Sequence, residues 1–361
     1  MSVSFSRWIP AGIAVVVVAA GAIAVPIAAN AASALAPKSA EQVLAMIGSS
    51  KVDAFSGELV TTSNLGLPSL PSGIGGASSS SSTAGVASIL SLLSSPQTAR
   101  IYVDGTTKER VQVVSSLAEQ DVIRNGKDVW QYDSKKNTVT HATLAARSDA
   151  KAPAQTQTPA EIAHALVTRL TSSTALSVGT NAQVAGRSTY TLVLTPKAKD
   201  TLIGSVAISV DSATGLPLAV EATARGQHDP AIGVSFRSIT LSAPAASLFD
   251  FTAPKGAKVT QQSAPKRATA PKPTVSARPS VAKPTVVGSG WDAVVETAAS
   301  ASSSTSMSKL TRQKLFSELT TAVAGGRVLH TSLANVLITT DGRVLAGSVS
   351  VDRLIAVAAQ K

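Results

Sequence analysis

The residues of this sequence that come nearest to a catalytic arrangement are Glu119 and Asp121. They occupy alternate positions of an expected strand, so both side chains point to one face. Two carboxylates placed in this way could divide the roles of general acid and general base. Arg110 and Arg124 lie on the same run of strands, however, and opposite charges on neighbouring strands pair readily. We therefore interpret the carboxylates as part of a ladder of opposite charges.

The other residue types that carry chemistry are scattered or absent. The chain contains no Gly-x-Ser-x-Gly elbow, no Walker loop and no dinucleotide-binding glycine fingerprint. It has no cysteine, which excludes disulfides, thiolate zinc sites, thiol catalysis and acylation of an N-terminal cysteine. We expect a protein that is not an enzyme and that binds neither a metal nor a cofactor. The histidines lack the spacing and the neighbouring carboxylates of a metal site, and they are His141, His164, His228 and His330.

The net charge of +11 comes mainly from one proline-rich segment. Nucleic-acid sites combine basic and aromatic residues on a folded surface, so we expect no nucleic-acid partner for this segment. It could instead attract an anionic membrane or wall polymer, or serve only as a solvated spacer. No acidic residue lies between residues 255 and 290, and the basic ones are Lys255, Lys258, Lys266, Arg267, Lys272, Arg278 and Lys283.

The N-terminus has the features of an export segment. Arg7 precedes an uncharged apolar run from Trp8 to Ala29, and small residues suited to cleavage follow it. Residues 1–34 are thus expected to be a signal peptide or, since about 20 apolar residues can span a bilayer, an uncleaved membrane anchor. In both cases the rest of the chain is expected outside the cytoplasm, in the cell envelope.

A long run of residues alternates between apolar and polar side chains, with the period of two that is typical of strands. Tight-turn pairs, Asp104-Gly105 and Asn125-Gly126, join successive strands into hairpins. Helices are expected at Ser39–Ile47 and at Thr158–Leu170, the second opened by a capping box. This order predicts an α+β fold, in which a strongly curved antiparallel sheet has helices on one side. The expected strands are 55–62, 100–104, 109–115, 119–124, 128–132, 138–144, 190–195, 206–211, 218–224 and 234–241.

Changes in composition divide the chain into four parts: residues 1–34, a main domain at 35–254, a Pro/Lys-rich linker at 255–290 and a small C-terminal α/β module at 291–361. Within the main domain, residues 63–95 form a Ser/Gly-rich insertion that is either a flap over the sheet or a floppy loop. The module is expected to hold a helix at Lys309–Val323 and two strands around Asp341. A core of this size is marginal alone, so the module is expected to dock on the main domain or on a partner.

Three motifs occur in the order found in a family of periplasmic proteins. The segment from Gly126 to Asp133 resembles a "G-x-x-x-W-x-Y-x" hairpin strand of LolA-like and MucB/RseB-like proteins. The segment from Val210 to Leu218 is similar to their "D-x-x-T-G-x-P" turn, and Phe249 to Gly256 resembles their closing "F-x-F…P-x-G" element. The resemblance covers Ser39 to Val259, and Arg327 to Leu354 resembles the C-terminal module of actinobacterial members.

The resemblance implies an unclosed β half-barrel over a helical lid, with an apolar cavity that takes acyl chains. In that family LolA carries lipoproteins, and RseB-like members sense envelope stress and bind an anti-sigma factor. With strand parity as the guide, the side chains expected to line the cavity are Leu59, Ile101, Val103, Val111, Val113, Trp130, Tyr132, Leu192, Ile208, Val220 and Phe236.

We therefore expect an exported binding protein that sequesters a lipid, or an acyl chain of a lipoprotein, in an apolar cavity. Its partners would be a lipid or an acylated protein, and an anionic membrane or wall surface contacted by the basic linker. The first alternative is an envelope-stress sensor that binds an anti-sigma-like membrane protein. The second is a wall-associated structural protein attached through the linker.

Overall fold

The computed structural model describes residues 35–66, 98–115, 118–144, 172–263, 284–297 and 314–360. These residues form two sheets, one of thirteen strands and one of six. No helix within the described residues is both long and apolar enough to cross a membrane. The export segment, most of the insertion, the predicted helix at Thr158–Leu170 and most of the linker lie outside the described residues.

The large sheet confirms all ten expected strands. Its order is β13-β6-β5-β4-β3-β2-β1-β12-β11-β10-β9-β7, with β8 paired to β9. Every pairing is antiparallel except that of β13 with β6. The strands are β1 (Ala54–Ser63), β2 (Thr98–Asp104), β3 (Lys108–Ser115), β4 (Ala118–Asn125), β5 (Asp128–Asp133), β6 (Thr138–Thr143), β7 (Thr174–Val178), β8 (Ala182–Val184), β9 (Arg187–Pro196), β10 (Ile203–Asp211), β11 (Pro217–Ala224), β12 (Pro230–Thr240) and β13 (Lys258–Ser263).

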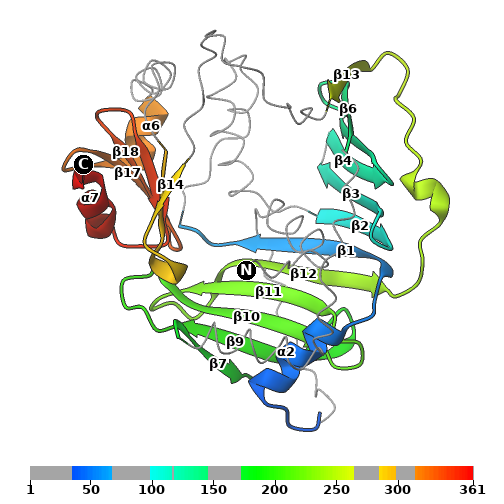
Figure 1. Ribbon diagram of the computed structural model, residues 1–361, viewed down its shortest axis with the longest axis horizontal. Coiled ribbons are helices and arrows are strands. Elements are labelled where there is room, and N and C mark those ends of the chain that lie inside the picture. Colours follow the sequence, from blue (N-terminus) through cyan, green and yellow to red (C-terminus); the bar gives the residue numbers. More distant parts are fainter. Residues whose placement is uncertain are drawn as a thin grey trace, which may run out of the picture.

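The large sheet is unclosed and bends sharply, so that β2–β6 stand as a wall on a floor made of β1 and β7–β12 (Figure 1). A β-bulge interrupts the pairing of β1 with β12 between Glu58 and Leu59, and bulges increase the local twist of a strand. Gly57 lies beside this bulge, where an added Cβ would approach the Phe236 ring to 2.8 Å. The absence of a side chain at Gly57 therefore lets Phe236 pack against β1 at the bend.

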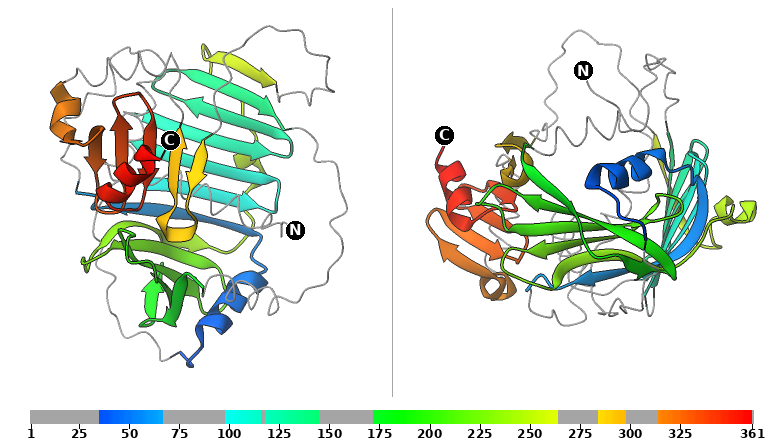
Figure 2. Two further views of the ribbon diagram at one scale, coloured as in Figure 1. Left: turned by 60° about the vertical axis from the view of Figure 1, so that its left-hand side comes forward. Right: turned by 90° about the horizontal axis from the view of Figure 1, so that it is seen from below.

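Helix α2 (Ala40–Ser49) covers the concave face of the floor (Figure 2). It begins with a capping box in which Ser39 and Gln42 exchange hydrogen bonds between side chain and backbone. Val43 is fully buried against Tyr190 and Leu192, the apolar side chains that β9 presents to the helix. The structure confirms the helix predicted at Ser39–Ile47.

The convex face of the wall is covered by the segment that follows β12. Its short helix η2 (Ala246–Phe249) lies against β3 and β4, outside the curve of the sheet (Figure 2). Phe249 is 1% exposed, and the Leu248 carbonyl accepts a hydrogen bond from Arg110. The segment then enters β13, which pairs with β6 although it lies within the stretch predicted to be a linker.

The C-terminal module is a six-stranded antiparallel sheet with a core of its own. The predicted helix at Lys309–Val323 is wrong at its end, because Thr320–Val323 form a strand paired to the next one. Threonine and valine favour strands, and Ala324-Gly325, with Gly325 at φ +79°, supplies the turn. The two strands expected around Asp341 are confirmed as β18 and β19. The elements are β14 (Thr285–Val287), η3 (Gly290–Asp292), β15 (Val294–Thr297), α6 (Lys314–Leu319), β16 (Thr320–Val323), β17 (Gly326–His330), β18 (Asn335–Thr339), β19 (Val344–Gly347) and α7 (Val351–Ala359).

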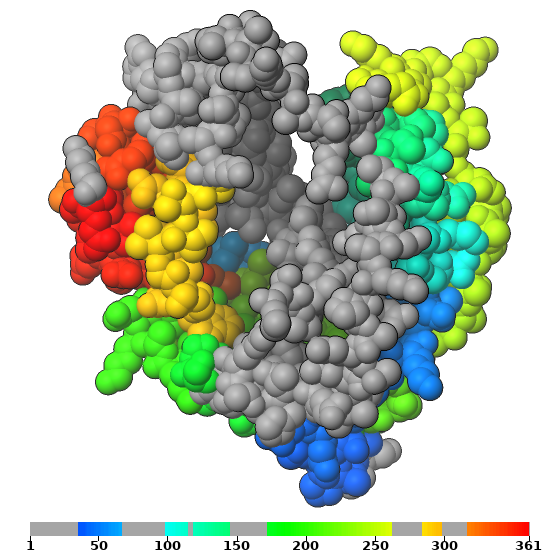
Figure 3. Space-filling model, viewed as in Figure 1, coloured from blue at the N-terminus to red at the C-terminus, as the bar shows by residue number. Residues whose placement is uncertain are grey.

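The module contacts one end of the floor, opposite the wall (Figure 3). An isolated β-bridge joins Thr201 to Val349, and the indole Nε1 of Trp291 donates a 2.7 Å hydrogen bond to the Thr174 hydroxyl. Leu333 is buried in a small apolar cluster with Leu65 and Ala224 of the floor. The module therefore packs on the large sheet through both apolar and backbone contacts.

Candidate binding face

The concave face of the large sheet carries nine of the eleven side chains predicted to line a cavity. Residues paired across antiparallel strands point to the same face, and alternate residues of one strand share a face. Leu59 pairs with Ala99 and Phe236, Ile101 with Val111, and the alternation continues across β12, β11, β10 and β9. The nine are Leu59, Ile101, Val103, Val111, Val113, Leu192, Ile208, Val220 and Phe236.

Eight of these nine side chains belong to two apolar clusters on one face. Leu59, Ile101 and Phe236 are buried in the cluster at the bend, and Val103, Val111 and Val113 pack against it. Leu192 and Ile208 contact the cluster under α2. Val220 contributes to neither cluster and is 38% exposed.

The concave face also carries an apolar residue that sequence reasoning missed. Val122 on β4 pairs with Val111 on β3, so both point into the curve, and Val122 is 45% exposed. Together with Val220 it leaves exposed apolar surface on both wall and floor. Exposed apolar surface on a concave face is the usual starting point for binding an apolar ligand.

The placement of Trp130 and Tyr132 in the cavity is wrong. Trp130 pairs with Ile123 on β4, the neighbour of Val122, and therefore points to the convex face. There Trp130 stacks on His141, with ring centroids 3.7 Å apart. The rings of Trp130 and Tyr132 both contact the Phe251 ring. Two residues at alternate positions of one strand share a face, but this spacing alone does not show which side chains of the next strand lie on the same face. These aromatic residues hold the segment after η2 onto the wall.

The two carboxylates that resemble a catalytic pair in the sequence are both held by side chains of the neighbouring strand. Asp121 is 2% exposed and accepts a 2.5 Å hydrogen bond from Arg110, and Glu119 accepts one from Gln112. Burial raises the pKa of Asp121, and the hydrogen bond from Arg110 opposes that rise. The charge ladder is confirmed for Arg110 but wrong for Arg124, which lies on the concave face opposite Glu109.

A second buried carboxylate shapes the turn between β10 and β11. Asp211 accepts hydrogen bonds of 2.9 and 2.8 Å from the Arg187 guanidinium and others from the amide and hydroxyl of Thr214. Burial of Asp211 would raise its pKa, but the hydrogen bonds from Arg187 and Thr214 outweigh burial, and the pKa lies below its ordinary value. Gly215 follows at φ +75°, with the Met46 carbonyl oxygen where a Cβ would lie. The turn is thus fixed tightly under the last turn of α2.

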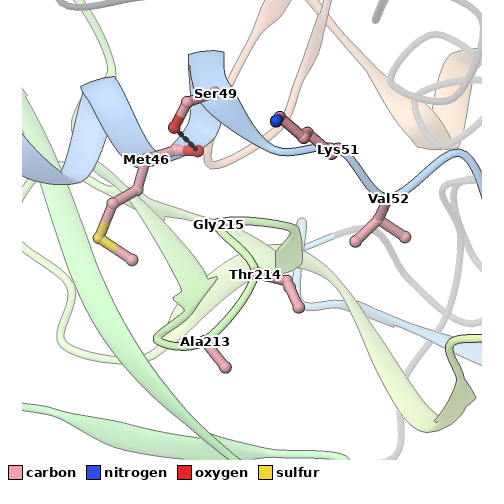
Figure 4. Close-up of a pocket in the computed structure, with 7 residues that line it drawn as sticks. All are labelled: Met46, Ser49, Lys51, Val52, Ala213, Thr214 and Gly215. Carbon is pink, nitrogen blue, oxygen red and sulfur yellow. Dashed lines mark hydrogen bonds between the residues drawn. The ribbon is translucent and has the colours of Figure 1, made fainter.

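A pocket of about 430 Å³ opens between the end of α2 and this turn (Figure 4). Its walls are contributed by α2, by the link from α2 to β1 and by the turn, which face one another across it. The lining residues are Met46, Ser49, Lys51, Val52, Ala213, Thr214 and Gly215. Sequence reasoning missed them; the "D-x-x-T-G-x-P" motif marked the turn but not its contact with α2.

The described part of the chain holds no group of three His, Cys, Asp or Glu residues arranged to bind a metal. Of the four histidines, His141 contacts Asp128 and Gln261, each at 2.8 Å, and His330 contacts Asn335. His228 lies within the described residues and belongs to no such group. His164 lies outside the described residues.

Comparison with known proteins gives one family match. Residues 112–252 match the model of the outer membrane lipoprotein carrier protein LolA. A search of curated proteins finds no match to this sequence.

Several solved structures are similar to this chain at low sequence identity. A chain of the Pseudomonas aeruginosa MucA/MucB complex shares 16% identity, with a TM-score of 0.44, over 88% of this chain and 96% of its own. An uncharacterized conserved protein of Thermus thermophilus shares 11% sequence identity, with a TM-score of 0.36, and the match covers 62% of this chain and 99% of that one. A LolA superfamily protein of Nitrosomonas europaea shares 12% sequence identity, with a TM-score of 0.23, and the match covers 60% of this chain and 99% of that one. The family match spans β4 to β12 and both the Trp130–Tyr132 strand and the Asp211–Gly215 turn. Residues 112–252 thus match the LolA model, in agreement with the resemblance that the motifs predicted.

Proposed function

We propose that this protein is an exported carrier that holds a lipid, or an acyl chain of a lipoprotein, on the concave face of its large sheet. The observation that carries the proposal is the gathering of nine predicted side chains, with Val122, on one face of a curved sheet. Burial of apolar area supplies about 25 cal/mol per Å², which is the physical driving force for such a ligand. The LolA match over residues 112–252 supports the same kind of ligand.

The proposal includes an extracytoplasmic location and a non-enzymatic mode of action. The apolar run from Trp8 to Ala29 supports export, as a cleaved signal or as an anchor. The carboxylate pair nearest to a catalytic arrangement is engaged with Arg110 and Gln112, and Asp121 is too buried to meet a substrate. The nine predicted side chains on the concave face offer apolar contact, as expected of a binding protein.

The experiment that tests the proposal is analysis of lipid bound to the protein purified from its own cell envelope. We expect native mass spectrometry to show adducts of lipid mass, and the purified protein to take up a fluorescent fatty acid. Protein that is consistently empty and takes up no fatty acid would contradict the carrier function.

A second function, that of a sensor, is favoured by the packed C-terminal module. A carrier domain needs no second sheet, whereas a sensor needs a surface for its regulatory partner. The bridge between Thr201 and Val349 and the bond from Trp291 to Thr174 connect the module directly to strands of the floor. This function predicts co-purification with a single-span membrane protein that is lost on weakening those contacts, and unchanged co-purification would exclude it.

A further inference from the structure

The pocket between α2 and the β10–β11 turn lies where the two apolar clusters of the concave face meet. Met46 packs against the cluster under α2, and Val52 packs against the cluster at the bend. Leu216, the residue after Gly215, is buried in the bend cluster as well. An apolar chain lying on the concave face could therefore continue into this pocket without leaving apolar surroundings.

The pocket has one charged side chain, the ammonium group of Lys51. No carboxylate lines the pocket, and among the described residues no acidic side chain pairs with Lys51, which is exposed. The nearby carboxylate of Asp211 is occupied by Arg187 and Thr214. The Ser49 hydroxyl donates to the Met46 carbonyl and the Thr214 hydroxyl donates to Asp211, so the Lys51 ammonium is the side-chain donor that this lining leaves for an oxyanion. Small-molecule sites typically enclose about 300–1,000 Å³, and this pocket falls within that range.

We propose that this pocket receives the anionic head group of an amphiphile whose acyl chain lies on the concave face. Lys51 forms the ion pair with the carboxylate or phosphate of the ligand, and Met46 and Val52 contact the first methylene groups of its chain. The inference rests on the proposed carrier function and deepens it, because it names the ligand class as lipids with an anionic head. Neutral lipids with the same chain bind only through the apolar face.

The test compares pairs of probes that share one chain. Oleate and methyl oleate differ in the carboxylate, and oleoyl lysophosphatidate and mono-olein differ in the phosphate, so the two pairs distinguish the two head groups. The variant Lys51→Gln is measured in the full-length protein, with Lys51→Arg as the charge-preserving variant. Lys135→Gln, an exposed lysine in the β5–β6 turn, is the matched control.

For Lys51→Gln we expect about fivefold to tenfold weaker binding of at least one anionic probe, as for loss of a charged hydrogen-bond partner. Binding of the neutral probes should stay within about twofold, and Lys51→Arg and Lys135→Gln should bind like the parent protein. Equal losses for anionic and neutral probes, or no loss, would overturn the inference while leaving the carrier function intact. If Lys51→Gln has a lower melting temperature but still discriminates between anionic and neutral probes as the parent protein does, Lys51 only stabilises the C-terminal end of α2, and the inference is overturned. Parent protein that binds none of the four probes would overturn both proposals.

Discussion

Replacing Val122 by aspartate separates the two faces of the wall in one experiment. Val122 points into the curve and is 45% exposed, so the substitution leaves the apolar clusters intact. Val114 on the neighbouring strand has the same side chain and is 48% exposed, but it pairs with Glu119 and points to the convex face. Val114→Asp is therefore a control matched in residue type and exposure.

The size of the effect follows from the exposed area of Val122. Burying a whole valine side chain contributes about 1.5–3 kcal/mol, so covering the exposed 45% with an acyl chain contributes about 0.7–1.4 kcal/mol. Aspartate loses that contribution and also places a charge under the ligand, which costs several kcal/mol more unless the charge is paired or neutralised. We expect the dissociation constant for a fatty acid to rise more than tenfold in Val122→Asp, since a factor of ten is about 1.4 kcal/mol.

The assay is displacement of a fluorescent fatty acid from the full-length protein, with urea unfolding of each variant as a check on the fold. Both substitutions place aspartate in a strand and should cost up to about 1 kcal/mol of stability. Affinity should fall in Val122→Asp and stay within about twofold in Val114→Asp. Equal affinities in the two variants, or a loss only in Val114→Asp, would refute the assignment of the concave face as the binding surface.

Four further predictions concern the elements that hold this face in shape. A left-handed alanine costs about 1–2 kcal/mol, and Gly215→Ala should cost more than that because its Cβ meets the Met46 carbonyl. Gly126→Ala, at φ +62°, has open space around the Cβ and should show only the backbone cost. Chemical unfolding of the two variants measures the difference in stability, and equal losses would contradict the prediction. Asp211 has a lowered pKa in the folded protein, so its ionised form stabilises the fold at pH values above the unfolded pKa of about 3.9. This stabilisation is lost as the pH falls through the folded pKa. Urea unfolding should therefore show that Asp211→Asn removes more stability near pH 7 than near pH 3. Asp121 has a raised pKa, so its contribution falls as pH rises from the unfolded to the folded value, and Asp121→Asn should give the opposite trend in the same titration. Trp291→Phe should weaken packing of the module by about 1 kcal/mol through loss of the bond to Thr174, which faster proteolysis between the module and the sheet would reveal.

The strands could be predicted from the sequence because their signals are local. Alternation of apolar and polar residues and the pairs Asp104-Gly105 and Asn125-Gly126 located the hairpins, and both glycines have the positive φ that such turns require. Strand β13 gave no signal, since its described side chains are exposed and it pairs with β6 through its backbone. Thr320–Val323 continued a helical pattern in sequence, and only pairing with β17 makes it a strand.

The candidate site was predictable strand by strand but not from one strand to the next. The Asn125-Gly126 turn places Trp130 opposite Ile123, so the phase within that hairpin could be derived. Between β3 and β4 the sequence is Ser116-Leu117, which has no turn signal, and the relation of Val111 to Trp130 depends on it. The pocket depends on contact between α2 and a turn more than 160 residues later, and no local pattern encodes such a contact.

Photo-crosslinking with a diazirine-bearing fatty acid tests most directly whether the inside of the curved sheet is where the ligand lies. Peptide mapping by mass spectrometry should locate the label on strands β2 to β4 and β10 to β12, at side chains such as Val111, Val122 and Val220. An excess of unlabelled fatty acid should abolish this labelling. Label confined to convex positions such as Val114 and Val259, or labelling that unlabelled fatty acid does not reduce, would contradict the proposed binding face.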